Sequence, residues 1–151
     1  MTDQIKPPLD PRDRFLCWAA IAFGLGFAVH GLDHLHRGMS ASPILIVVGG
    51  GVQGLFVATA IVMVLMRRTR APLAAIAVGF GSALVFTYAH LLPTVWSGYQ
   101  DSFVSLPHTN VTWFSWLSAV AEIGTGIVFA FAGIQAARAR STRRAAALAH
   151  R

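Results

Sequence analysis

The chain has 151 residues, of which 55% are hydrophobic and only 12% are charged, and its formal net charge is +6. A water-soluble helical bundle is disfavoured because the long apolar segments lack the polar stripe that a water-facing helix needs. Nucleic-acid binding is a poor explanation of the positive charge, since the basic residues are divided among three segments and form no recognisable reading module.

Four apolar segments fill most of the chain. Each is long enough to cross the hydrocarbon layer of a membrane, which needs about 20 residues of helix. We expect membrane-spanning helices over residues 14–36, 44–66, 72–92 and 114–135. The sequence therefore predicts an all-α integral membrane protein that folds as a four-transmembrane-helix bundle in the lipid bilayer.

The lysine and arginine residues indicate how these spans are oriented. Most of them precede the first span, join the second to the third or follow the fourth: Lys6, Arg12, Arg14, Arg67, Arg68, Arg70, Arg138, Arg140, Arg143 and Arg144. Positive charge favours the cytoplasmic side, so both termini are predicted to be cytoplasmic. We expect a cytoplasmic segment over 1–13, a transmembrane domain over 14–137 with an outward loop at 93–113, and a basic cytoplasmic tail over 138–151, in a bacterial-type plasma membrane.

The outward end of the first span carries several ionisable side chains. His30 and His34 are four residues apart, and Asp33 follows His30 by three, so all three are expected on nearly the same side of one helix. Two histidines at this spacing can present their imidazoles to one metal ion. The sequence therefore predicts a metal site at this end of the span.

Two further candidate ligands lie on other spans. His90 is near the outward end of the third span, and Glu122 lies deeper in the fourth. An ionised Glu122 inside the membrane would cost about 2.5 to 3.5 kcal/mol without compensation, and a bound cation would offset that cost. We predict a metal site formed by His30, Asp33, His34, His90 and Glu122. Imidazole and carboxylate ligands suit Zn, Cu or Fe.

This outward-facing cluster would serve metal handling or a redox partner complex, and three alternatives remain open. A histidine of the first span and His90 could hold a haem b in an electron-transfer protein. His30-Gly31-Leu32-Asp33-His34 has the spacing of the inverted zincin motif, with aspartate in place of its glutamate, as in a zinc-dependent membrane hydrolase. The cluster could also be purely structural, in a non-catalytic accessory or assembly subunit of a membrane complex.

The outward loop and the glycines complete the sequence evidence. Asp101 and His108 lie among interfacial aromatic residues in the loop at 93–113, which would either cover the histidines as a lid or anchor the chain at the membrane surface. Glycine pairs such as Gly50 and Gly54 permit close approach of helices, in a compact bundle or in a homodimer. No feature of the sequence names an enzymatic reaction.

Overall fold

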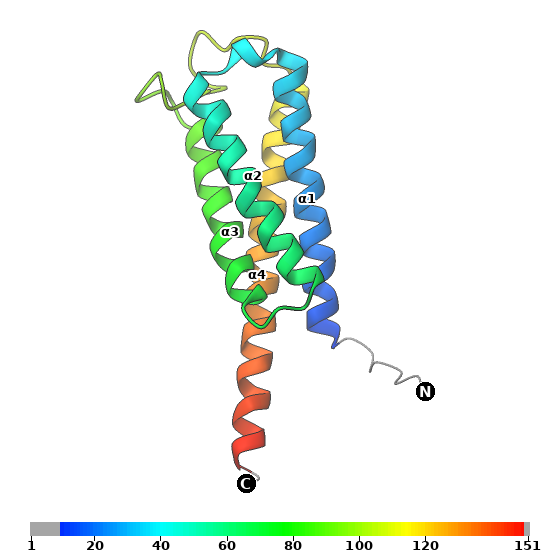
Figure 1. Cartoon of the computed structure of the whole chain (residues 1–151). Helices are drawn as coiled ribbons and strands as arrows, with labels where there is room; N and C mark the ends of the chain where they lie inside the picture. The colour runs from blue at the N-terminus through cyan, green and yellow to red at the C-terminus, as the bar shows by residue number, and fades with distance from the viewer. Residues whose placement is uncertain (1–9, 150–151) are drawn as a thin grey trace, which may run out of the picture.

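The computed structural model describes residues 10–149, and within them the chain forms four long helices (Figure 1). These are α1 (Pro11–Arg37), α2 (Ile44–Leu65), α3 (Ala71–Phe86) and α4 (Trp113–Ala149). Two short turns accompany them: a 3-10 turn at Met39–Ala41 and a π-helical turn at Thr87–Leu91 that continues α3. All four helices are long and apolar enough to cross a membrane. The all-helical prediction is confirmed, and the structure is consistent with an integral membrane protein.

The ends of the helices follow from local sequence. Asp10 precedes α1, and its carboxylate accepts a hydrogen bond from the backbone N–H of Arg12 at 2.9 Å, while Pro11 occupies the first helical position. This is the side-chain capping that helix starts favour. Gly38 ends α1 with a φ of +90°, a conformation that glycine adopts without the steric cost that a Cβ would bring. The chain then turns into α2 within a few residues.

α4 is longer than the predicted fourth span. It runs for 37 residues without interruption, so residues 138–149 of the predicted tail continue the same helix and project beyond the bundle (Figure 1). Two ion pairs tie this extension to the start of α1. Arg140 contacts Asp13 at 2.9 Å, and Arg143 contacts Asp10 at 2.8 Å. These contacts place the beginning of α1 and the extension of α4 at the same end of the molecule.

Helices α1, α3 and α4 pack closely through small residues. A Cβ atom added at Gly79 of α3 would lie 2.5 Å from the backbone oxygen of Gly126 in α4, and one added at Gly26 of α1 would lie 2.6 Å from the Oγ1 of Thr125. Such contacts allow helix backbones to approach one another, as small residues do in membrane bundles. The predicted role of glycine in close packing is therefore confirmed for the pair Gly79 and Gly126.

α2 is the least buried of the four helices. Its buried residues are Val57, Ala60 and Val64, all in the half that lies farther from the histidines. In the other half, a Cβ added at Gly49, Gly50 or Gly51 would meet nothing within 4 Å. These glycines therefore do not serve close helix packing. They leave free space between α2 and its neighbours.

Candidate metal centre

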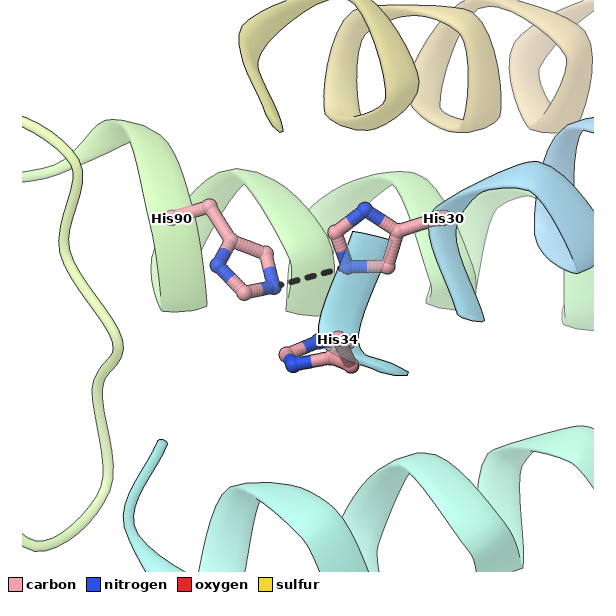
Figure 2. Close-up of side chains that lie close together, drawn as sticks. All are labelled: His30, His34 and His90. Carbon is pink, nitrogen blue, oxygen red and sulfur yellow. Dashed lines mark hydrogen bonds between the residues drawn. The ribbon is translucent and has the colours of Figure 1, made fainter. Parts of the chain in front are cut away.

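Three of the predicted ligands come together in the structure. His30 and His34 project from α1, and His90 projects from the π-helical turn at the end of α3 (Figure 2). One potential ligand atom from each side chain lies within 4.8 Å of the others. His30 and His90 are only 2% and 1% exposed, and His34 is half-buried. The geometry can hold a single metal ion.

The closest contact joins two side-chain nitrogens. The Nε2 of His30 lies 3.1 Å from the Nε2 of His90, as the dashed line in Figure 2 marks. Two nitrogens bound to one tetrahedral metal ion at about 2.0 to 2.1 Å would be about 3.3 Å apart. The observed spacing is therefore close to that of two ligands of the same ion.

Hydrogen bonds to the opposite ring nitrogens show where the protons of His30 and His90 lie. The Nδ1 of His90 is 3.1 Å from the backbone carbonyl oxygen of Asp101, and because a carbonyl only accepts, this nitrogen is the donor. The Nδ1 of His30 is 3.3 Å from the hydroxyl of Ser118, which already donates to the carbonyl of Ser115 at 2.9 Å. That hydroxyl must then accept from His30. In their neutral forms both rings thus carry a lone pair on Nε2.

His34 follows the same pattern. Its Nδ1 lies 3.0 Å from the hydroxyl of Ser42, and this hydroxyl donates to the carboxylate of Asp101 at 2.7 Å. The hydroxyl therefore accepts from Nδ1, and the Nε2 of His34 also keeps its lone pair. Metal-ligating histidines usually donate their second N–H to such partners, which fixes the tautomer and the ring orientation.

With these tautomers, a cation would relieve the 3.1 Å contact. Two Nε2 lone pairs at this distance repel one another, and neither ring has a proton left to place between them while it stays neutral. A proton shared by His30 and His90 or a metal ion bound by both would remove the repulsion. His34 offers a third lone pair beside this contact, so the three side chains could hold one metal ion.

The π-helical turn explains how His90 reaches this position. A π-helical turn breaks the regular hydrogen-bond pattern at the end of α3 and is frequent at functional sites. Here the carbonyls of Ala89 and His90 accept hydrogen bonds from the backbone N–H groups of Asp101 and Phe103, at 3.0 and 2.8 Å. The loop 93–113 is thereby attached to the turn Thr87–Leu91. This attachment sets the carbonyl of Asp101 against the His90 ring.

An ion pair fixes the same loop to α1. The guanidinium of Arg37 donates to both carboxylate oxygens of Asp101, at 2.7 and 2.9 Å, and also to the carbonyl of Thr109 at 2.9 Å. Burial opposes ionisation of Asp101, but the hydrogen bonds from Arg37 and Ser42 outweigh it and lower the pKa of Asp101 below its ordinary value. The carboxylate is thus charged at neutral pH. The loop is therefore held against α1 beside the histidines, and its role as a lid or as an anchor stays a prediction.

Asp33 and Glu122 lie outside the three-histidine group. Asp33 follows His30 by three residues and is turned toward α4, where it accepts a hydrogen bond from Ser115 at 2.8 Å. The i+3 position is rotated to the opposite side of His30 from the i+4 position of His34, which explains why the two side chains diverge. The expected common side for all three residues is therefore not observed. Metal ligation by Asp33 stays a prediction.

Glu122 occupies the fourth helix one turn deeper than Ser118. Its side chain is fully buried, and neither carboxylate oxygen has a hydrogen-bond partner among residues 10–149. A Cβ added at Gly26 of α1 would lie 3.3 Å from the Cα of Glu122, so this residue lies at the interface of α1 and α4. Its participation in metal binding also stays a prediction.

The sequence did not reveal the hydrogen-bond partners of the histidines. These are the hydroxyls of Ser42 and Ser118 and the main-chain carbonyl of Asp101. Ser115, Ser118 and Glu122 follow one another at intervals of three and four residues, which places them along one helix face. That spacing was a readable signal for Ser118. A backbone carbonyl in a loop has no signal of this kind.

The two other histidines of the described chain lie apart from the cluster. His36 is exposed, and its ring centroid lies 6.5 Å from that of Phe114. His108 is exposed in the outward loop. Both therefore provide natural controls for experiments on the buried histidines.

Comparison with known proteins found no match. No protein-family model matches the chain. Likewise, no curated protein and no solved structure matches it. The functional argument therefore depends on the geometry of the three histidines and their hydrogen bonds.

Proposed function

We propose that His30, His34 and His90 bind one transition-metal ion through their Nε2 atoms. The observation that carries this proposal is the 3.1 Å contact between two Nε2 atoms whose rings both donate from Nδ1. A metal ion converts that repulsive contact into two bonds. The hydroxyl and carbonyl partners of the Nδ1 atoms would hold the three rings ready for the ion.

The ligand set limits the choice of metal. Three imidazoles without a thiolate suit Zn²⁺, Cu²⁺ or Fe²⁺ and are poor ligands for Mg²⁺ or Ca²⁺. Three protein ligands also leave one tetrahedral position open, as in zinc sites that react with a bound molecule. The site would therefore serve in the handling of the metal or in chemistry on a ligand of that metal.

The proposed site lies at the outer face of a membrane-embedded bundle. Support comes from four helices of spanning length and from the basic residues beside the opposite ends of these helices. In this orientation the termini are cytoplasmic. The metal would then be reached from outside the cell or from the outer half of the bilayer.

Haem ligation by two histidines agrees less well with the geometry. Axial nitrogens on the two faces of one haem are separated by two metal–nitrogen bonds, a distance of about 4 Å. The nitrogens of His30 and His90 are 3.1 Å apart, with no room for a porphyrin plane between them. Purified protein without an absorption band near 400 nm in the Soret region would agree with a non-haem site.

The hydrolase alternative also lacks its general base at this site. The motif would require Asp33 to reach a metal-bound water, but Asp33 accepts a hydrogen bond from Ser115 and lies 3.9 Å from Arg37. Its carboxylate is thus directed toward α4 and the end of α1. For this reason we propose metal binding without assigning a hydrolytic reaction.

Elemental analysis of the detergent-purified protein tests the proposal. We expect close to one equivalent of metal per chain, lost in the double variant His30→Ala/His34→Ala and retained in the control His36→Ala. Equal metal content in all three proteins would contradict the assigned ligands. Absence of metal from every preparation, even after incubation with Zn²⁺ or Cu²⁺, would leave the cluster with a structural role in an accessory subunit.

A further inference from the structure

A large pocket lies directly beside the three histidines. It has a volume of about 700 Å³ and is enclosed by α1, α2 and the end of α3. His30, His34 and His90 all contribute to its wall. Binding sites for small molecules have volumes of about 300 to 1,000 Å³, so this space is sufficient for a ligand much larger than water.

Three consecutive glycines of α2 leave room for this pocket. Gly49, Gly50 and Gly51 all line it, and a Cβ at any of them would meet nothing within 4 Å. Gly31 of α1 lines the same space and is equally unobstructed. At Gly79, by contrast, an added Cβ would clash with α4. The glycines of the pocket therefore create room beside the histidines.

The remaining lining is almost entirely apolar. Leu35, Leu45 and Val85 contribute to the walls and are also exposed on the surface of the bundle. The opening is therefore lined by the kind of surface that faces lipid. Gln53 is also in the lining, but its amide donates to Ser82 and is already paired. The histidine nitrogens are thus among the few polar groups that a bound molecule would meet.

Trp96 and Tyr99 of the outward loop complete the pocket. Amphipathic aromatic side chains favour the interface between membrane and water. Their position indicates that the histidine end of the pocket lies near this interface, while the apolar walls extend toward the hydrocarbon layer. A ligand with a polar head and an apolar body would match both environments.

We infer that the pocket binds a membrane-dissolved molecule with a compact oxygen-bearing head and a long apolar body, its head oxygen occupying the open position of the metal. This inference rests on the proposed metal site and names the ligand of that site. Carboxylate, alcohol and quinone heads share the required chemistry. The pocket wall would select for the apolar body, and the metal would bind the head.

Cobalt substitution provides a direct test. Co²⁺ bound by three histidines has visible absorption bands that change when a fourth ligand binds, so the full-length protein in phosphatidylcholine nanodiscs can be loaded with Co²⁺ and titrated. The probes are decanoate, decan-1-ol and decylubiquinone, with acetate as a head group that has no apolar body. We expect at least one of the three apolar probes to shift the bands, at concentrations where acetate does not. The probe that responds identifies the head group.

Two glycine variants test the pocket independently of the metal site. Gly50→Leu would fill the pocket and should weaken the response to the apolar probe by on the order of tenfold, with the cobalt bands retained. Gly124→Leu is the matched control, because a Cβ at Gly124 also meets nothing within 4 Å but this residue is absent from the pocket lining. Both variants contact the same bilayer, so partitioning of the probe into lipid cancels in the comparison.

The outcomes are distinct. Absence of cobalt bands in the wild-type protein would overturn the metal site and, with it, this inference. Cobalt bands that respond to none of the apolar probes would overturn the inference alone. An undiminished response in Gly50→Leu, or an equal response to acetate and decanoate, would show that the pocket does not select the ligand.

Discussion

Replacing Asp101 by asparagine would leave the guanidinium of Arg37 buried beside an uncharged amide. The two side chains are 5% and 0% exposed and are joined by hydrogen bonds of 2.7 and 2.9 Å. Removal of one partner from a buried ion pair costs about 3 to 5 kcal/mol, because the other charge is left without compensation. Asp33 remains 3.9 Å from the guanidinium, so we expect a loss near the lower limit, about 3 kcal/mol of unfolding free energy.

The same chain contains a more exposed ion pair that serves as a control. Asp13 contacts Arg140 at 2.9 Å, and these side chains are 24% and 30% exposed. Pairs that water can reach contribute about 0 to 1 kcal/mol, so Asp13→Asn should change the unfolding free energy by about that much at most. Reversible unfolding in mixed micelles, followed by helical circular dichroism, would measure both variants under the same conditions.

A triple substitution distinguishes the charge from the volume of the side chains. Arg37→Met and Asp101→Leu remove the ion pair, and Asp33→Asn removes the buried carboxylate 3.9 Å from Arg37 that would otherwise be left without compensation. Well-packed uncharged replacements of buried ion pairs are often neutral or stabilising, so the triple variant should be more stable than Asp101→Asn alone. Equal losses from Asp101→Asn and Asp13→Asn, or a triple variant that is the least stable of all, would refute the argument.

Three further predictions concern metal affinity, helix packing and the pH dependence of stability. Ser118→Ala should lower metal affinity by about 10- to 100-fold in a chelator-competition assay, because the Nδ1–H of His30 loses its acceptor. Gly79→Leu should lower the unfolding temperature while Gly81→Leu does not, since a Cβ at Gly79 lies 2.5 Å from a backbone oxygen of α4 and one at Gly81 meets nothing within 4 Å. The pKa of Asp101 is lowered by folding, so its contribution should be constant at neutral pH and lost on acidification below its ordinary value of 3.8, as unfolding of the wild type and Asp101→Asn across pH would show.

The helices were predictable because the membrane imposes a simple rule on sequence. A segment that crosses a hydrocarbon layer must be apolar over about 20 residues, and four such segments stand out in the composition. When α3 is taken together with its π-helical turn, the predicted bounds agree with the observed helices to within a few residues except at the end of α4. That helix continues through residues 138–149 because alanine and arginine both favour helix.

The candidate site was only partly predictable. The four-residue spacing of His30 and His34 placed both on one side of α1, and the depth of His90 placed it at the level of His34, whereas His30 was expected in a deeper layer and in fact meets both. The i+3 and i+4 spacing separates Asp33 from His34 around the helix, but the sequence of α1 does not say that the Asp33 side packs against Ser115 of α4. The roles of the Asp101 carbonyl and of the glycine-lined pocket depended in the same way on how the loop and α2 pack against the other helices.

Asp101 connects the loop 93–113 to two of the three histidines without joining the proposed ligand set itself. Its backbone carbonyl accepts from His90, and its carboxylate accepts from Ser42, which in turn accepts from His34. The same carboxylate neutralises Arg37, so it cannot also serve as a strong ligand. A single loop residue thus sets two ring tautomers while its negative charge is used elsewhere. Three neutral imidazole rings do not compensate the charge of a divalent cation that binds them. An incoming head group would therefore bind more strongly if it carried negative charge, which favours a carboxylate over a neutral alcohol.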